Sequence, residues 1–135
     1  MHILENDKVD LPNEKNPCVC RVGWSVDGSS YQLGEDKLSW GYGGTGKSSI
    51  ESKFRDYGKP FGVGDVITCY VDLDKVPKAI FFALNGEYLG VAFRFTNELG
   101  TKALFPHITV KNSKFMVNFG QQPPKYPLTL SLIHI

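Results

Sequence analysis

The chain has 135 residues, a length that suits one domain with a buried core. Its formal net charge is +1 and it has no basic or acidic run, which excludes a strong electrostatic footprint for polyanions. No apolar run approaches the roughly 20 residues that span a bilayer, so no membrane partner is expected. Three cysteines, an odd count, argue against a disulfide framework and fit a reducing compartment.

The first predicted elements are a polar lead-in and a strand. Residues 1–18 are mostly polar and contain Pro12 and Pro17, which predicts a lead-in loop. Residues 19–26 then predict the first strand of a domain.

Residues 41–48 read Gly-Tyr-Gly-Gly-Thr-Gly-Lys-Ser and match the phosphate-loop pattern. Such a loop must follow a buried parallel strand and open a helix. Here the preceding residues 37–40 are short and alternating, and the later chain predicts hairpins instead of crossover helices. A solvated glycine-rich loop is therefore favoured, and nucleotide binding at Gly41–Ser48 stays the alternative.

Residues 48–57 carry the one helix-like pattern. Ile50, Phe54 and Tyr57 fall at i, i+4 and i+7, which would form a single apolar stripe. Gly58 and Pro60 close this short segment, so it predicts either a helical turn or an irregular loop.

The remaining elements predict antiparallel β-structure. Residues 66–73 alternate between two faces, as in a strand that is covered on one side. Asn85-Gly86 separates two apolar runs and predicts a tight hairpin turn. Residues 114–119 alternate again. Turn residues recur every ~8–12 residues, which is typical of a β-sandwich or barrel.

Several short segments in a fixed order carry a family resemblance. Together they resemble a SPRY domain, most closely that of the heterogeneous nuclear ribonucleoprotein U family. The segments are Arg21–Ser25, Leu33–Tyr42, Asp65–Cys69, Asn85–Phe93, Leu104–His107 and Val117–Gly120. The resemblance implies an all-β fold, an antiparallel β-sandwich of the concanavalin-like two-sheet kind, over residues 19–127, with binding loops at one end.

Two departures from the family pattern shape the domain boundaries. The family has further strands before the position of Val19, so the chain resembles a SPRY domain that is incomplete at its N-terminus. Residues 128–135 are apolar where the family is rich in proline and acid. They are expected to form an unmatched tail outside the domain, as non-native sequence would.

The resemblance also implies a binding residue. The SPRY subunit of trithorax-type histone methyltransferase complexes has a similar Arg-Leu-Gly-Trp-Ser, and its arginine grips an acidic peptide. Arg21 is the matching residue here, and a guanidinium binds a carboxylate with two parallel hydrogen bonds. Gln32 and Glu35 stand where that subunit has a proline and a tyrosine. The alternative for Arg21 is a pair with Asp36 or Glu35.

Aromatic residues complete the candidate rim. Tyr31, Tyr42 and Tyr57 are expected at the partner-binding surface, because tyrosine combines a rigid apolar ring with a polar tip. Trp24 and Trp40 are expected in the core.

No catalytic residue, metal ligand or cofactor is expected. Cys18 and Cys20 with His107 lack the spacing and the fourth ligand of a structural zinc site. We expect His107 to have a hydrogen-bonded structural role, and no nucleophile stands with a base at a recognisable spacing.

The expected function is a non-enzymatic, nuclear interaction module of an RNA-associated protein, with a peptide or protein loop as its partner. RNA would bind other regions of the full-length protein. The alternative is direct RNA contact through the same loops, with Lys47, Lys53 and Arg55 on phosphates.

Overall fold

The structure is a computed structural model that describes residues 1–6, 18–121 and 123–126. These residues contain ten strands and no helix, and so no helix that could cross a membrane. The strands are β1 (His2–Asn6), β2 (Val19–Ser25), β3 (Ser39–Gly43), β4 (Lys47–Ile50), β5 (Lys53–Asp56), β6 (Ile67–Asp72), β7 (Lys78–Leu84), β8 (Glu87–Phe95), β9 (Phe105–Lys111) and β10 (Ser113–Met116).

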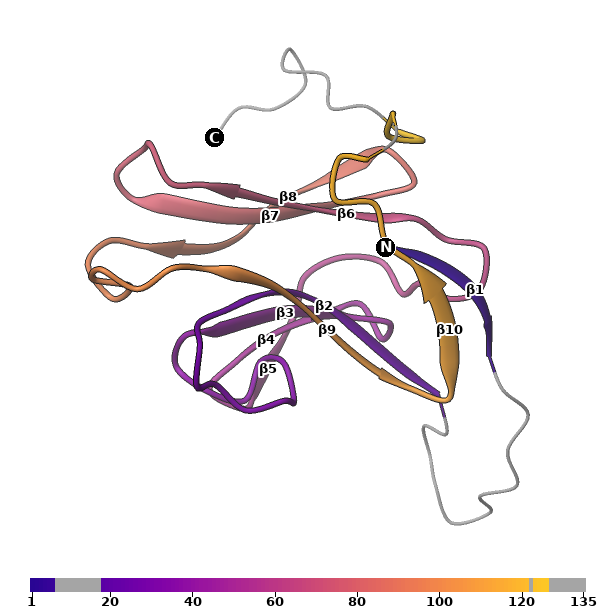
Figure 1. The fold of residues 1–135 in the computed structure, drawn as a ribbon, viewed down its shortest axis with the longest axis horizontal. Helices are drawn as coiled ribbons and strands as arrows, with labels where there is room; N and C mark the ends of the chain where they lie inside the picture. Colours follow the sequence, from indigo (N-terminus) through magenta and orange to yellow (C-terminus); the bar gives the residue numbers. More distant parts are fainter. Residues whose placement is uncertain (7–17, 122, 127–135) are drawn as a thin grey trace.

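The strands form two layers (Figure 1). One layer is a five-stranded sheet in the order β5-β4-β3-β2-β9, and the other is a three-stranded sheet in the order β6-β7-β8. Strands β1 and β10 pair at one side of the sandwich. Every strand pairing is antiparallel. This architecture confirms the predicted all-β sandwich.

The core lies between the two sheets. The five-stranded sheet contributes Val22, Trp40 and Tyr42, and the other sheet contributes Ile80 and Phe82. Trp40 stacks on Phe95 with ring centroids 4.9 Å apart. Burial of each such side chain contributes about 1.5–3 kcal/mol, so this core is the main source of stability. Trp40 is 2% exposed, as expected of a core residue.

The Asn85-Gly86 hairpin is confirmed. Both residues have positive φ, 51° and 85°, and Leu84 pairs with Glu87 across the turn. Positive φ at both central positions is the requirement of a type I′ turn, which Asn-Gly satisfies with little strain.

The two interpretations of residues 48–57 were both wrong. The segment is a β-hairpin in which β4 pairs with β5, from Lys47 opposite Asp56 to Ile50 opposite Lys53. Glu51 and Ser52 form its turn, with φ of 52° and 59°. The helical spacing of Ile50, Phe54 and Tyr57 was a coincidence. The sequence did not predict the hairpin because neither turn residue is the glycine or asparagine that signals one.

The lead-in prediction also needs correction at its start. Residues 2–6 form β1, which pairs with β10, and His2 also bridges to Val66. Residues 7–17 lie outside the described part of the chain, as does the segment 128–135.

Candidate functional site: the outer face of the five-stranded sheet

The site begins with the alternation of β2. Val22 and Trp24 pack toward the core, so Arg21 and Gly23 face outward. A Cβ on Gly23 would lie 1.9 Å from the carbonyl oxygen of Trp40 on the neighbouring strand. Only glycine fits at this position, which explains its place in the Arg-Val-Gly-Trp-Ser segment.

A loop, residues 26–38, covers part of this outer face. Its Leu33 is fully buried, and a Cβ on Gly41 would lie 3.0 Å from Leu33 Cγ. The Leu33 amide donates to Thr109 Oγ1 on β9 at 3.0 Å. Small residues on β3 therefore make room for a loop that is fixed to the sheet. We call this segment the covering loop.

His107 and Thr109 anchor the covering loop to β9. His107 Nε2 and Thr109 Oγ1 lie 2.9 and 2.8 Å from the carbonyl oxygen of Tyr31. His107 Nδ1 lies 2.8 Å from Ser25 Oγ. Tyr31 itself is 94% exposed. His107 thus has hydrogen-bonded partners on both ring nitrogens, as its predicted structural role requires.

Arg21 lies beside this loop on the sheet. Its Nη1 donates to the carbonyl oxygen of Leu33 at 3.3 Å, and its guanidinium carbon lies 5.3 Å from the Phe54 ring centroid. Phe54 is on the same face because β3 pairs with β4 and β4 with β5. Sequence reasoning missed Phe54, and only the strand pairing could have placed it there.

Among the described residues, no carboxylate pairs with Arg21. Glu35 and Asp36, the partners considered from the sequence, instead bond within the covering loop. Glu35 Oε2 accepts a hydrogen bond from Ser30 Oγ at 3.1 Å, and Asp36 Oδ2 accepts one from the Ser30 amide at 2.6 Å. The Arg21 charge is therefore available for an external anion.

A shallow hollow of about 220 Å³ opens beside Arg21. Its lining includes Arg21, Thr45, Lys47, Ser49 and Phe54, and no aspartate or glutamate of the described residues lines it. We call it the Arg21 hollow. Two cations, hydroxyl donors and the aromatic rings of Phe54 and Phe61 suit a carboxylate with an adjacent apolar group.

The phosphate-loop interpretation of residues 41–48 lacks its structural basis. The motif spans an antiparallel hairpin between β3 and β4, with no helix after it. The Gly44 amide donates to the Cys20 carbonyl at 3.0 Å, and the Gly46 amide donates to the Gly43 carbonyl at 2.9 Å. A phosphate loop binds its anion through such backbone N–H groups, and here both already donate to protein carbonyls.

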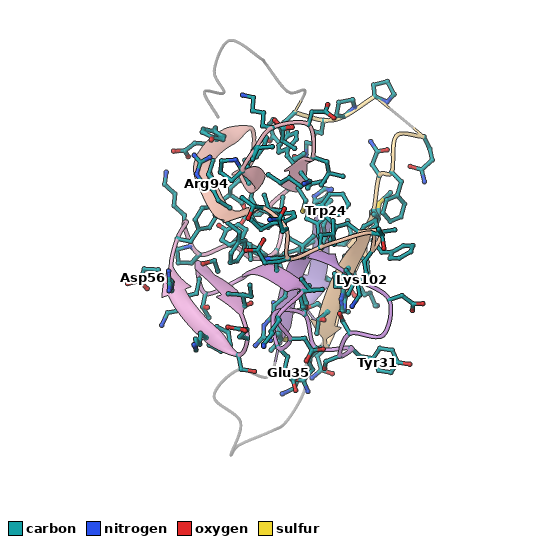
Figure 2. All side chains as sticks on the ribbon, turned by 90° about the vertical axis from the view of Figure 1, so that its left-hand side faces the viewer. Trp24, Tyr31, Glu35, Asp56, Arg94 and Lys102 are labelled. Atoms are coloured by element: carbon teal, nitrogen blue, oxygen red, sulfur yellow. The ribbon has the colours of Figure 1, made fainter. Side chains whose placement is uncertain are left out.

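The six predicted binding residues do not form one rim. Tyr31, Gln32 and Glu35 are exposed on the covering loop, and Arg21 lies beside it. Figure 2 shows Tyr31 and Glu35 at the lower end of the molecule, away from Arg94.

Tyr42 and Tyr57 were wrongly assigned to that rim. Tyr42 is fully buried, and Tyr57 is half-buried with its ring 5.3 Å from that of Tyr42. The Tyr42 hydroxyl donates to the Lys59 carbonyl, and burial raises its pKa to about 12. The Tyr57 hydroxyl donates to the Gly90 carbonyl at 2.6 Å. Both rings belong to the core.

The part of the chain that the structure describes holds no group of three or more metal-ligating side chains. Cys18 and Cys20 form no disulfide with another described residue, and burial raises the pKa of the Cys20 thiol.

Comparison with known proteins identifies the family. The SPRY domain model matches residues 8–122. The chain is 48% identical over 110 residues to the probable ATP-dependent RNA helicase ddx1 of Dictyostelium discoideum, covering 82% of the chain. It is 45% identical over 111 residues to heterogeneous nuclear ribonucleoprotein U-like protein 2 of Mus musculus, covering 81% of the chain. These matches span 14% and 15% of the two relatives.

Proposed function

The chain belongs to the SPRY domain family, and we propose that it is a non-enzymatic module that binds a peptide or protein loop. The proposal extends to its setting, a nuclear protein of the RNA-associated kind that the relatives' names describe. In that setting other regions of a longer protein would bind RNA. The C-terminal end of the domain at residue 127 remains part of this proposal.

The unpaired charge of Arg21 is the observation that carries the proposal. The guanidinium is half-buried, bonds to the Leu33 carbonyl and lies against Phe54, so its position is fixed before a partner arrives. A fixed cation loses little conformational entropy on binding, and its remaining N–H groups can bind a carboxylate in a bidentate way.

Lys47 adds a second positive charge to the hollow and so favours a negatively charged partner. It lines the same hollow, and no aspartate or glutamate of the described residues does. The partner that fits is an acidic peptide or loop with an apolar side chain next to its carboxylate. Glu35 keeps its negative charge, but its carboxylate accepts a hydrogen bond from Ser30 and does not line the hollow.

The covering loop supplies the second contact region. Tyr31 is almost fully exposed while its carbonyl is held by His107 and Thr109. A ring on a fixed backbone provides contact area at low entropic cost. Tyr31, Gln32 and Glu35 are proposed to select among acidic partners.

Direct RNA contact is the second candidate. Lys47, Lys53 and Arg55 are exposed on β4 and β5. Phosphate contacts weaken steeply as salt rises, whereas a peptide held by one arginine and an aromatic ring depends less on salt.

Fluorescence anisotropy with a labelled short peptide that carries one glutamate next to a leucine, and with labelled single-stranded RNA, tests the proposal. We expect Arg21→Ala to abolish peptide binding and Arg55→Ala, the matched arginine outside the hollow, to retain it. Equal binding by the wild type and Arg21→Ala would contradict the proposal. RNA binding that is lost in Arg55→Ala and absent at high salt would support the second candidate.

A further inference from the structure

Strand β5 is an exposed edge of the five-stranded sheet. It ends the order β5-β4-β3-β2-β9, and all of its residues, Lys53–Asp56, are exposed. Figure 2 shows Asp56 at the left edge of the molecule, away from Tyr31. Exposure of the whole strand means that the other sheet covers neither of its faces, which leaves room for a further strand beside it.

The register of the β4–β5 hairpin shows which backbone groups face outward. Its turn, Glu51-Ser52, has two residues, so Ile50 and Lys53 form the hydrogen-bonded pair that closes it. Such pairs alternate along an antiparallel ladder, so the N–H and C=O groups of Phe54 and Asp56 face away from β4. Among the described residues, no backbone group bonds to them on that side.

The side chains of β5 make this edge positive. Lys53 and Arg55 are exposed, and neither pairs with a carboxylate of the described residues. Asp56 is the one acidic residue of the strand. On a neighbouring strand, carboxylates directly opposite Lys53 and Arg55 would be attracted and cations would be repelled. The edge therefore favours an acidic strand.

A second copy of the chain is a poor occupant of this edge. If two β5 strands paired antiparallel with Phe54 opposite Phe54, Lys53 of each copy would lie opposite Arg55 of the other. If Phe54 lay opposite Asp56, the two Arg55 side chains would lie opposite each other. Both registers place like charges opposite, and charged edge strands prevent self-association in this way.

We propose that β5 binds an extended acidic segment of a partner protein as an added antiparallel strand. The outward groups of Phe54 and Asp56 bond to the backbone of that segment, and Lys53 and Arg55 select its carboxylates. Antiparallel pairing is favoured because it is slightly more stable per residue than parallel pairing. These contacts do not involve Arg21, so the site is separate from the proposed function.

The register defines the peptide. It has glutamate opposite Lys53 and Arg55, and a β-branched apolar residue opposite Phe54. Phe54 is 52% exposed, so its ring can pack against that residue. A third carboxylate opposite Asp56 would be repelled, and this position is therefore threonine. Read in the antiparallel direction, the probe is acetyl-Thr-Glu-Val-Glu-amide.

N-methylation separates strand addition from a purely electrostatic contact. The N–H of the probe's valine faces the Phe54 carbonyl, whereas the N–H of its first glutamate faces away from β5. N-methylation of the valine should weaken binding at least about fivefold, and N-methylation of that glutamate less than about twofold. Equal losses from both methylations would overturn the proposal.

Charge reversal tests the selection of carboxylates. Lys53→Glu combined with Arg55→Glu should abolish binding of the probe and create binding of acetyl-Thr-Lys-Val-Lys-amide. Both positions are exposed, so the fold should be retained. A doubly changed chain that binds the original probe as well as the wild type does would contradict the proposal. Loss of the probe in Arg21→Ala would also contradict it, because the probe would then bind in the Arg21 hollow.

Nuclear magnetic resonance titration of the 135-residue chain measures these affinities and locates the probe. The amides of Phe54 and Asp56 should exchange with solvent quickly alone and slowly with saturating probe. No binding of the probe would overturn the proposal, and so would slow exchange without it, because the edge would then already be covered. Shifts of these amides with single-stranded RNA and none with the probe would overturn it in favour of RNA contact.

Discussion

The Arg21 guanidinium lies 5.3 Å from the ring centroid of Phe54, although their strands, β2 and β5, are separated by two others. The contact is possible because the positions between them on this face carry small residues, Gly41, Gly43 and Ser49. Long side chains can therefore lie flat across the sheet, and the cation is held against an aromatic ring.

Phe54→Ala tests that arrangement. Phe54 is 52% exposed, so we expect little change in the free energy of unfolding. Loss of a cation–π contact at an exposed site should weaken peptide binding about two- to fivefold in anisotropy measurements. Phe105→Ala is the matched control, because Phe105 is 51% exposed and faces outward on β9. Equal effects of both changes would contradict the role of Phe54.

Tyr57→Phe should destabilise the fold. The Tyr57 hydroxyl donates to the Gly90 carbonyl at 2.6 Å and accepts a hydrogen bond from the Phe82 amide at 3.3 Å, which joins the segment after β5 to the opposite sheet. Its removal leaves two partly buried groups unpaired, at a cost of about 1–3 kcal/mol. Urea unfolding measures this, with the exposed Tyr31→Phe as a control. An unchanged midpoint for Tyr57→Phe would contradict the assignment.

Stability should decline in alkaline solution. Burial raises the pKa of Cys69 from 9.0 to about 12 and that of Tyr42 from 10.0 to about 12. The folded state holds these protons more tightly than the unfolded state does. Their contribution to the free energy of unfolding is therefore full below pH 9 and is lost as pH rises toward 12.

Urea midpoints measured across that range give the change of stability with pH, and Cys69→Ala should make that change smaller. A midpoint that is constant from pH 9 to 12 would show that these groups are not buried in the protonated form.

Lys47→Ala should reveal no nucleotide site. The Gly44 and Gly46 amides already donate to protein carbonyls, and Lys47 is exposed, so neither ATP binding nor stability should differ from the wild type. Calorimetric titration with magnesium and ATP measures this. Micromolar binding that disappears in Lys47→Ala would restore the phosphate-loop interpretation.

The fold was largely predictable where a local signal existed. The Asn85-Gly86 turn could be predicted from its two residues alone, because both readily adopt the positive φ that the turn requires. The two-residue period of residues 66–73 likewise predicted the strand that the structure shows as β6. The turn at Glu51-Ser52 carries no such signal. Its conformation is imposed by the pairing of β4 with β5, which no local pattern of residues 48–57 contains.

The placement of the proposed binding residues was predictable only in part. Arg21 followed from the resemblance, and Tyr31 from its residue type. Tyr42 and Trp40 alternate with Ser39, Gly41 and Gly43, a pattern that indicates large residues inward and small residues under a covering segment. This alternation predicts that Tyr42 is buried, as the structure shows. Phe54 had no comparable signal, because its position depends on three consecutive strand pairings.

The most direct test of the central claim is a cross-linked pull-down from nuclear extract, quantified by mass spectrometry. It compares the wild type with Arg21→Ala and with Arg55→Ala, an exposed arginine on β5 outside the Arg21 hollow. Our account predicts that one set of protein partners is lost with Arg21→Ala and kept with Arg55→Ala. The same partners at the same abundance in all three samples would contradict it.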